Sequence, residues 1–583
     1  MKPNKLLKMA RNLKPAKTSE PGSDLPPGDS PEPGEALEPG KNSEQGGALK
    51  AGTSSEPGGA LKAGTSSESR GALGPGKDSE SGGGLKPGRG LELGKGLMRG
   101  KGLNAESALR LVGMRYASAA LMLVAVAALY GAAAFSRPSA HAEKGGRAPV
   151  ASAALVCPGH ESGRLAVQST DHGRGGRADL TPTKGGTPLA TLTTPGQGWG
   201  KDAKSGGDSY TLRATGAIAA GLEAEQTTHH DDGADRGLAG TRCATPGTDM
   251  WFLGPGPASA DALDLYLTNV DSQPASVDLT GLSGEGPLDT LDGHGIRVDP
   301  STTKVVRVGK SAEGLGDLVK PAADLGLRVR TTGGRIAASM RVRAGKEKGI
   351  EWLPRSLAPA RTMLVPGVPG GPGKRRLLVA VPGEADAQIQ VRVATKDGTF
   401  VPAGQDVLDA PAGTVTSIPL DDSLSGRTAA VRLAADRPVL AGFSAERGAD
   451  IAYGAATPPL AESGPGVVAD NRLDSTLVLT APDGAATVQV TTVSAQGKSG
   501  PQEVSVPAGR TVETKLIAPD QNRRTAFGVI VTPKPGSPPV YASRTLSTGK
   551  GDGYLFTVLP IVPAATTIRL PGTVGSQTAL IPG

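Results

Sequence analysis

The densest group of metal-capable side chains in this sequence is His229, His230, Asp231 and Asp232, with Asp235 close by. Imidazoles and carboxylates are common ligands of divalent metals. Adjacent residues of a strand point to opposite faces, however, so both histidines rarely bind one ion. The spacing of an EF-hand is also absent. We therefore interpret the stretch as a polar, glycine-rich loop and expect no metal and no cofactor.

Ser301 and Lys304 match the Ser-x-x-Lys pattern of penicillin-binding serine enzymes, in which the serine begins a helix. The flanking segments IRVDP and VVRV favour strands instead, so we interpret the match as chance. No nucleophile elbow, zinc-protease helix, phosphate loop or dinucleotide fingerprint occurs, and six histidines leave little for general-base catalysis. Carboxylates are plentiful, which leaves a glycosidase pair open. We expect no catalytic residue and a protein that is not an enzyme.

Trp251 and Phe252, followed by Gly-Pro-Gly, form the sharpest aromatic feature. If exposed, the pair would suit a glycan platform. If buried, it would be a core strand beside a disulfide at Cys243, because tryptophans pack on such bridges in β-sandwiches. We favour the buried interpretation.

The elements that carry these residues follow the alternation of half-buried β-strands. Clear examples are 263–267, 389–393 and 488–493. The strand pattern recurs about every 95 residues, and the Pro-Ala-Gly turns at 411–413 and 507–509 are 96 positions apart. A repeat of this size predicts tandem immunoglobulin-like β-sandwiches. A single larger β architecture in which copies exchange strands is the alternative.

The predicted organisation is mainly β after a disordered region and one transmembrane helix. Its parts are a disordered cytoplasmic region with 12-residue repeats (1–107), a transmembrane anchor (108–137) and four β domains (150–256, 257–370, 371–465 and 466–583). Aromatic residues are only 3% of the chain, whereas Gly contributes 85 residues and Pro 49, which indicates disorder together with turn-rich β structure.

One uncharged run, Tyr116 to Phe135, has the length that a helix needs to cross a bilayer. Five basic residues precede it closely and three follow, which predicts a cytoplasmic N-terminus and an extracytoplasmic main part. The alternative is a signal peptide cleaved after Ala142, since Ala140-His141-Ala142 has the required small residues.

The two cysteines, Cys157 and Cys243, both follow the run. In an oxidising compartment we expect them to form one disulfide; two buried free thiols are the alternative.

The N-terminal region carries leucines at a strict period of twelve among Gly, Pro, Ser and charges, for example in 48–59 and 60–71. Such a composition buries too little apolar surface to fold. The first seventeen residues hold six basic and no acidic side chains, so we expect them to contact anionic lipid of the inner leaflet. Without an aromatic residue in this tail, and with a net charge of only +7, specific nucleic-acid binding has no support.

Three segments carry a family resemblance: CATPGTDMWFLGPG (243–256), LVCPG (155–159) and ATGAIAAGLEAEQ (214–226). Through them, residues of about 150 to 565 resemble domain-of-unknown-function family 5719, uncharacterised actinobacterial proteins that are membrane-anchored or secreted. The resemblance implies an extracytoplasmic compartment and this architecture, but no activity. The long leader before residue 100 departs from the family's usual short one.

These observations together predict a non-enzymatic cell-envelope protein that binds or scaffolds at the extracytoplasmic face. An envelope protein or polysaccharide is the expected partner. The alternatives are an enzyme acting on cell-wall glycan with an unrecognised site, and a membrane adaptor that acts through its cytoplasmic repeats.

Overall fold

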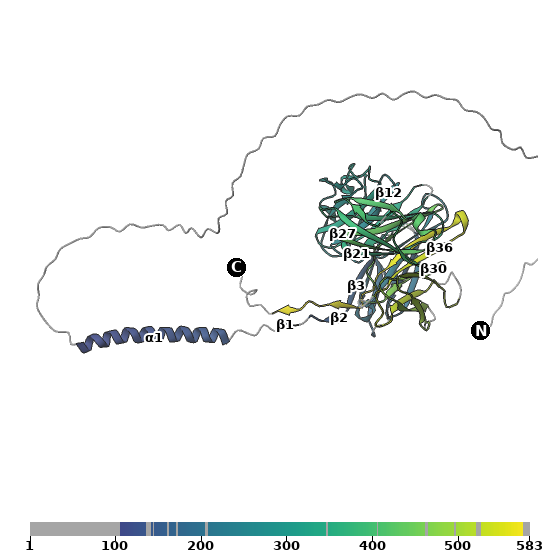
Figure 1. Cartoon of the computed structure of the whole chain (residues 1–583). Helices are drawn as coiled ribbons and strands as arrows, with labels where there is room; N and C mark the ends of the chain where they lie inside the picture. The colour runs from purple at the N-terminus through teal and green to yellow at the C-terminus, as the bar shows by residue number, and fades with distance from the viewer. Residues whose placement is uncertain are drawn as a thin grey trace, which may run out of the picture. The chain divides into compact units, whose positions relative to one another are not determined.

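The computed structural model describes residues 105–574, except 136–141, 144, 160–161, 171–172, 204–207, 346–347, 405, 461–463, 495–496 and 521–525. The repeats and the basic tail of the N-terminal region lie outside these residues. Helix α1 (Ala105–Phe135) contains the whole apolar run predicted from the sequence, and its side chains between Tyr116 and Tyr130 are exposed (Figure 1). Among the described residues, no helix is both long enough and apolar enough to span a membrane.

The rest of the described chain is almost entirely antiparallel β structure (Figure 1). It falls into four consecutive modules, each with two sheets that share a hydrophobic core: module 1 (152–243), module 2 (249–356), module 3 (360–455) and module 4 (466–561). The mainly β prediction is therefore confirmed.

Module 1 pairs two four-stranded sheets around Leu165, Leu180 and Leu212. The first sheet has the order β3 (Ser152–Cys157), β8 (Tyr210–Thr215), β5 (Arg177–Pro182), β6 (Ala190–Leu192); the second has the order β10 (Gly237–Arg242), β9 (Glu223–His230), β4 (Gly163–Gln168), β7 (Gly198–Ala203).

Module 2 has the same two-layer plan around Leu265, Leu327 and Val329. Its first sheet has the order β14 (Pro287–Leu288), β13 (Ala275–Leu282), β17 (Asp324–Gly333), β11 (Asp249–Pro255), β20 (Arg355–Ser356), with β15 (Ile296–Val298) beside β13; its second has the order β16 (Thr302–Arg307), β12 (Ala262–Asn269), β18 (Ala337–Arg343), β19 (Ile350–Leu353).

Module 3 is organised by one long strand, β27 (Ala429–Arg447), which runs through both layers. Its first half pairs with β21 (Ala360–Val368) and β23 (Ala387–Thr395), which β24 (Gly398–Phe400) and β25 (Leu408–Ala410) extend. Its second half pairs with β22 (Lys374–Ala380) and β28 (Asp450–Ala455), and β26 (Val415–Pro419) extends β22 before the short helix α2 (Asp421–Leu424).

Module 4 closes the series around Leu477, Val488 and Val529. Its first sheet contains β29 (Gly466–Val468), β35 (Gly528–Pro533), β31 (Ala486–Ser494), β32 (Gly497–Lys498) and β33 (Gln502–Val506); its second has the order β34 (Arg510–Leu516), β30 (Asp474–Ala481), β36 (Tyr541–Thr548), β37 (Leu555–Ile561).

Alternation explains why these segments are strands. In β23 the buried residues Ile389, Val391 and Val393 alternate with exposed Gln390 and Arg392, so that one face packs and the other meets water. Strands β12 and β31 likewise contain the other two predicted segments, 263–267 and 488–493. These three strand predictions are confirmed.

The two Pro-Ala-Gly turns lie at equivalent places, before β26 in module 3 and before β34 in module 4. Gly413 and Gly509 end them with φ of +69° and +67°. Only glycine adopts this backbone region without steric cost, which is why the same residue type recurs at both positions.

The last strands of the four modules meet one another. Strand β10 contacts β19, β19 contacts β28, β28 contacts β37, and β37 contacts β10 again. The modules therefore close into a ring of neighbours rather than extending as a string. The segments that precede module 1 and follow module 4 also pair with each other: β2 (Arg147–Pro149) with β38 (Thr567–Arg569), and β1 (Ala142–Glu143) with β39 (Thr573–Val574).

Neighbouring modules also share cores. Ile451 and Tyr453 of β28 belong to the core of module 2, and Phe556 and Val558 of β37 belong to that of module 3. Strand exchange between sheets is absent from the described strands, since every named sheet of a module uses that module's own strands. The four modules are thus separate in hydrogen bonding but joined in packing.

Two strands pair with strands beyond the domain limits at 256 and 370 that the sequence suggested. Strand β11 pairs with β17 and β20, so the segment assigned to the first domain by the limit at 256 opens module 2. Strand β21 pairs with β27, so it opens module 3 although the predicted limit was 370. Phe252 of β11 accordingly packs in the core of module 2.

Candidate functional site

Modules 1, 2 and 4, together with the segments that link the modules, line one cavity of about 640 Å³, which we call the junction cavity. Most of the lining is apolar. It is formed by 152–155, 219, 222–223 and 240–243 of module 1, by 252, 335, 338–339 and 352–356 of module 2, by 558–560 of module 4, and by the linking segments at 150, 244–246, 357–358, 456–458, 562–565 and 568. A concave apolar site with a few polar groups is the usual form of a ligand pocket.

An exposed isoleucine stands among these lining residues. Ile568 of β38 is 49% exposed, while Leu155, Trp352 and Leu353 are buried. Leu155 of β3 packs into the core of module 1. Because neighbouring residues of a strand point to opposite faces, the side chain of Ala154 faces away from that core. Apolar surface that stays in contact with water at Ile568 is available to a ligand.

Glu223 is the only carboxylate that lines the cavity among the described residues. Burial raises the pKa of Glu223 above its usual value, and the Arg242 guanidinium, which forms an ion pair with it, opposes that rise. A glycosidase needs two carboxyl groups that face each other across the substrate. The described lining offers one, and it is paired with Arg242.

Several buried polar atoms of lining residues have no hydrogen-bond partner among the described residues. They are Nε1 of Trp352, Oγ of Ser356, Oγ1 of Thr457 and Nε of Arg242. A buried donor left unpaired costs about 1–3 kcal/mol, so bound water or a ligand with acceptor groups would stabilise this region.

Buried charged side chains link module 1 to module 4. Glu225 of β9 accepts the N–H groups of Ala469 and Asp470 at 3.0 and 3.4 Å, and its carboxylate lies 3.1 Å from Nη2 of Arg544. Glu225 and Arg544 are 3% and 0% exposed at their side chains, and burial raises the pKa of Glu225 despite the opposing arginine. Removing either partner would leave an uncompensated buried charge, which typically costs 3–5 kcal/mol (an order-of-magnitude range).

Two further buried carboxyl groups join the last strands. Oε1 of Glu351 accepts the N–H of Gly240 at 3.0 Å and links β19 to β10. Oδ2 of Asp450 accepts the N–H of Phe556 at 2.6 Å and links β28 to β37. Burial raises the pKa of Glu351 well above its usual value and that of Asp450 to about 7. These groups hold the ring together from inside and do not line the cavity.

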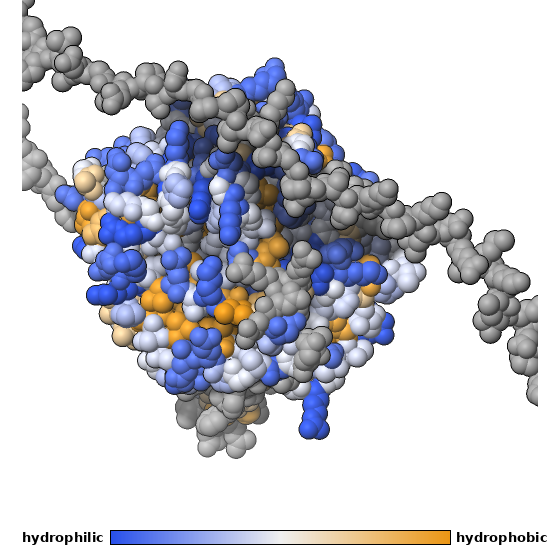
Figure 2. Space-filling view, turned by 90° about the vertical axis from the view of Figure 1, so that its right-hand side faces the viewer, coloured by the Kyte–Doolittle hydropathy of each residue, from blue (hydrophilic) through white to orange (hydrophobic). Residues whose placement is uncertain are grey.

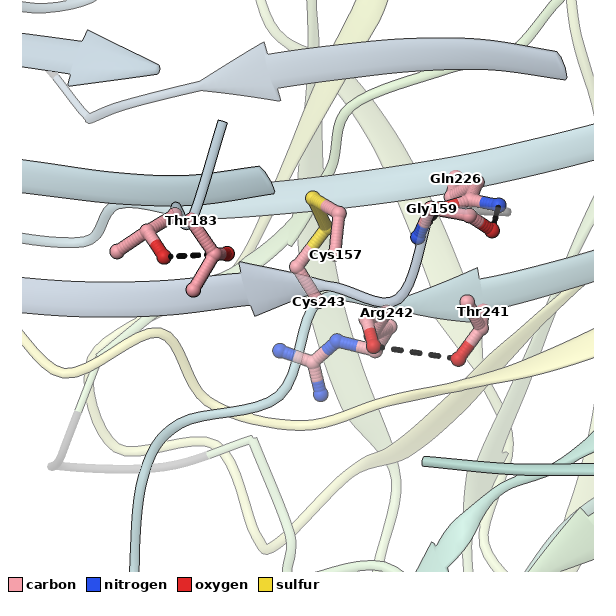
Figure 3. The surroundings of a disulfide bond; sticks show 8 residues. Cys157, Gly159, Thr183, Gln226, Thr241, Arg242 and Cys243 are labelled. Carbon is pink, nitrogen blue, oxygen red and sulfur yellow. Dashed lines mark hydrogen bonds between the residues drawn. A yellow bond between two sulfur atoms is a disulfide. The ribbon is translucent and has the colours of Figure 1, made fainter. Parts of the chain in front are cut away.

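Cys157 and Cys243 form a disulfide at the cavity wall, with their Cα atoms 4.3 Å apart (Figure 3). Val156 and Ala244, next to the bridge, exchange backbone hydrogen bonds of 2.9 and 2.7 Å. The amide of Gln226 fixes the chain just beyond Cys157 by accepting from Gly159 N at 3.0 Å and donating to its carbonyl at 3.1 Å. The bridge therefore holds the lining segment 240–246 against β3.

The histidines are not brought together with other ligands. His229 and His230 are the last two residues of β9, opposite Leu238 and Gly237 of β10, and Nε2 of His229 lies 3.1 Å from Oδ1 of Asp231. In the part of the chain that the structure describes, no group of three metal-capable side chains forms. Asp235 instead contacts Arg341 and Arg343 of module 2.

Ser301 lies in a turn with φ of +54°, and Lys304 lies within the strand β16, where it forms an ion pair with Glu313. No helix begins at this serine, so the local structure that Ser-x-x-Lys chemistry needs is missing here.

Trp251 is buried, as favoured from the sequence, but not beside the disulfide. It packs with Leu253, Leu282 and Leu378 between modules 2 and 3, and the Arg328 guanidinium lies 5.4 Å from its ring centre. The expectation of a tryptophan on the bridge was wrong because β11 belongs to module 2, whereas the bridge closes module 1.

The fold and the site define a β protein of four modules, with a mostly apolar cavity that modules 1, 2 and 4 and the linking segments line. The chain belongs to the family of unknown function DUF5719, whose family pattern matches residues 200–516. A structure described as a tetra-tandem repeat in the extending region of a large adhesion protein is 14% identical over 71% of this chain and 100% of that chain, with a TM-score of 0.08. No curated protein matches the chain.

Proposed function

We propose that this protein is an extracytoplasmic binding protein whose junction cavity holds an apolar segment of an envelope protein. The observation that carries the proposal is the cavity itself: three modules and the linking segments line it, its surface is mainly apolar, and Ile568 is exposed within it. Closure of the ring positions residues from distant parts of the chain around one volume. A rigid scaffold that presents such a site suits recognition.

The site of action in this proposal follows from the run Tyr116–Phe135. It is uncharged, it lies entirely within α1, and more basic residues precede it than follow it. It would anchor the chain in the cell membrane, with the basic tail at anionic inner-leaflet lipid and the modules outside. The disulfide supports an oxidising compartment, and the two-sheet modules are each of the size of an immunoglobulin-like domain.

A binding role without catalysis is also part of the proposal. It is supported by the single lining carboxylate, Glu223, which Arg242 already pairs, and by the separate positions of the histidines. The competing function is an enzyme of wall glycan that uses Glu223. Turnover of an envelope glycan by the purified chain, abolished by Glu223→Gln, would favour that enzyme instead.

Retention of an envelope protein on the immobilised full-length chain tests the cavity. Ala154→Trp places a large side chain at the lining, and we expect at least a tenfold loss of retention, equivalent to about 1.4 kcal/mol. The matched control is Ala385→Trp, at an exposed turn outside the cavity, which should retain the partner like the unmodified chain. Equal behaviour of the two variants would show that the partner binds elsewhere.

Reporter fusions test the compartment separately. A reporter after Gly583 should be active only outside the cytoplasm and one before Met1 only inside. Activity of both reporters on the same side would contradict the anchored topology, and a mature chain that begins near Glu143 would indicate a cleaved signal.

A further inference from the structure

A second hollow, distinct from the junction cavity, lies between modules 3 and 4. It has a volume of about 660 Å³ and we call it the basic groove. Its lining holds five cationic side chains and one carboxylate, together with a run of hydroxyl groups. The cations are Lys396, Arg427, Arg447, Arg510 and Lys515; the carboxylate is Glu513; the hydroxyl-bearing residues are Thr428, Thr476, Thr511, Thr545, Ser547 and Tyr554.

The pairing register of three neighbouring strands places a row of side chains along one side of the basic groove. Lys515 of β34 lies opposite Thr476 of β30, which lies opposite Thr545 of β36. Directly opposite residues of neighbouring strands share a face of the sheet. A lysine and two threonine hydroxyls therefore form one row across three strands. All are hydrogen-bond donors at fixed spacing.

The cations of the groove are incompletely neutralised. Lys396 and Arg427 share one carboxylate, Asp397, at 2.9 and 3.3 Å. Arg447, Arg510 and Lys515 form no ion pair among the described residues; the guanidinium of Arg447 instead lies 3.8 Å from the ring centre of Tyr554.

The one lining carboxylate is also engaged. Oε1 of Glu513 accepts the hydroxyl of Thr428 at 2.9 Å, across the boundary between the two modules. The groove thus presents a surplus of positive charge with donors beside it, held where two modules meet.

We propose that the basic groove binds an acidic glycan, through its carboxylate or phosphate groups at Arg447, Arg510 and Lys515 and its sugar hydroxyls at the threonine row. Guanidinium and ammonium groups recognise such anions by charge-assisted hydrogen bonds. This ligand adds to the proposed binding function. Because the basic groove and the junction cavity share no lining residue, an experiment can refute binding at one site without refuting binding at the other.

A glycan fits the groove better than nucleic acid or an acidic protein. Single-stranded nucleic acid needs aromatic faces on which bases stack, and the single lining aromatic ring, Tyr554, is already covered by Arg447. The hydroxyl row offers partners for a chain that itself carries many hydroxyl groups, which an acidic peptide does not.

The test is binding of polygalacturonate oligomers to the full-length chain in detergent, by calorimetry. Lys515→Glu reverses one unpaired charge of the groove. Its matched control is Lys310→Glu, an exposed lysine of module 2 with the same change in net charge. The basic N-terminal tail is identical in both variants, so the difference between them isolates the groove. We expect about tenfold weaker binding for Lys515→Glu and less than twofold for the control.

The proposal is overturned if both variants weaken binding equally, or if neutral dextran binds as tightly as polygalacturonate. Binding of polyglutamate or a single-stranded oligonucleotide that is as tight, and equally sensitive to Lys515→Glu, would assign the groove to an acidic protein or to nucleic acid. Phosphate-bearing and carboxylate-bearing glycans compared in the same assay identify which anion the groove prefers.

Discussion

Asp450 should make the stability of the ring depend on pH. Its side chain is fully buried at the start of β28, and Oδ2 accepts the N–H of Phe556 from module 4. Burial raises the pKa of this carboxyl to about 7 in the folded protein. An aspartate of the unfolded chain titrates near 3.9, so as pH rises from about 4 to about 7 the unfolded state loses the proton first.

The sign follows from this order: the free energy of unfolding falls as pH rises, by about 4 kcal/mol across that window, and is constant above it. Asp450→Asn removes the titration and keeps an acceptor oxygen for Phe556. Urea unfolding of both proteins, followed by tryptophan fluorescence at pH 4.5 and pH 8, should show a difference that shifts by about 3 kcal/mol in favour of the variant at the higher pH, because part of the total effect is already lost at pH 4.5. Exposed Asp409→Asn is the control. Parallel pH profiles of the unmodified protein and Asp450→Asn would refute the reasoning.

Three further predictions concern the stability of the four modules. Phe556→Ala removes a side chain of module 4 from the core of module 3 and should lower the stability of both in one calorimetric transition, by about 3–5 kcal/mol; loss confined to module 4 would show independent modules. Cys243→Ser should cost about 2–5 kcal/mol, read as a lower midpoint in urea, and an unchanged midpoint would contradict a structural role for the bridge. Gly509→Ala, at φ of +67°, should destabilise by about 1 kcal/mol or more, whereas Gly383→Ala in open space should change stability by less than about 0.5 kcal/mol, as measured by thermal melting.

The local sequence pattern was enough to predict the strands, but it was not enough to predict how the strands assemble. The alternation of apolar and polar residues predicted β12, β23 and β31. The glycine of each Pro-Ala-Gly turn has a left-handed backbone conformation. The ring could not be predicted in this way, because its closing strands, such as β10 with the sequence GLAGTR, are buried on both sides and show no alternation.

The buried acids were missed for a related reason. Glu225, Glu351 and Asp450 are charged residues in strands, where a charge normally indicates a face in water. Their burial depends on contacts between residues more than a hundred positions apart, such as Asp450 with Phe556. A signal did exist for Glu351, which is the only charged residue of the apolar segment IEWL. The junction cavity, which segments from distant parts of the chain enclose, has no counterpart in any local motif.

Site-specific photo-crosslinking in living cells shows directly whether the junction cavity holds an envelope protein. A benzophenone amino acid is placed at Ile568, which is 49% exposed in the cavity, and in a second strain at Ile517, which is 63% exposed but lines neither hollow. The account predicts an adduct of one defined protein from position 568 that Ala154→Trp abolishes, and none of that size from position 517. The same adduct from both positions, or an adduct at 568 that persists when Ala154→Trp fills the cavity, would contradict it.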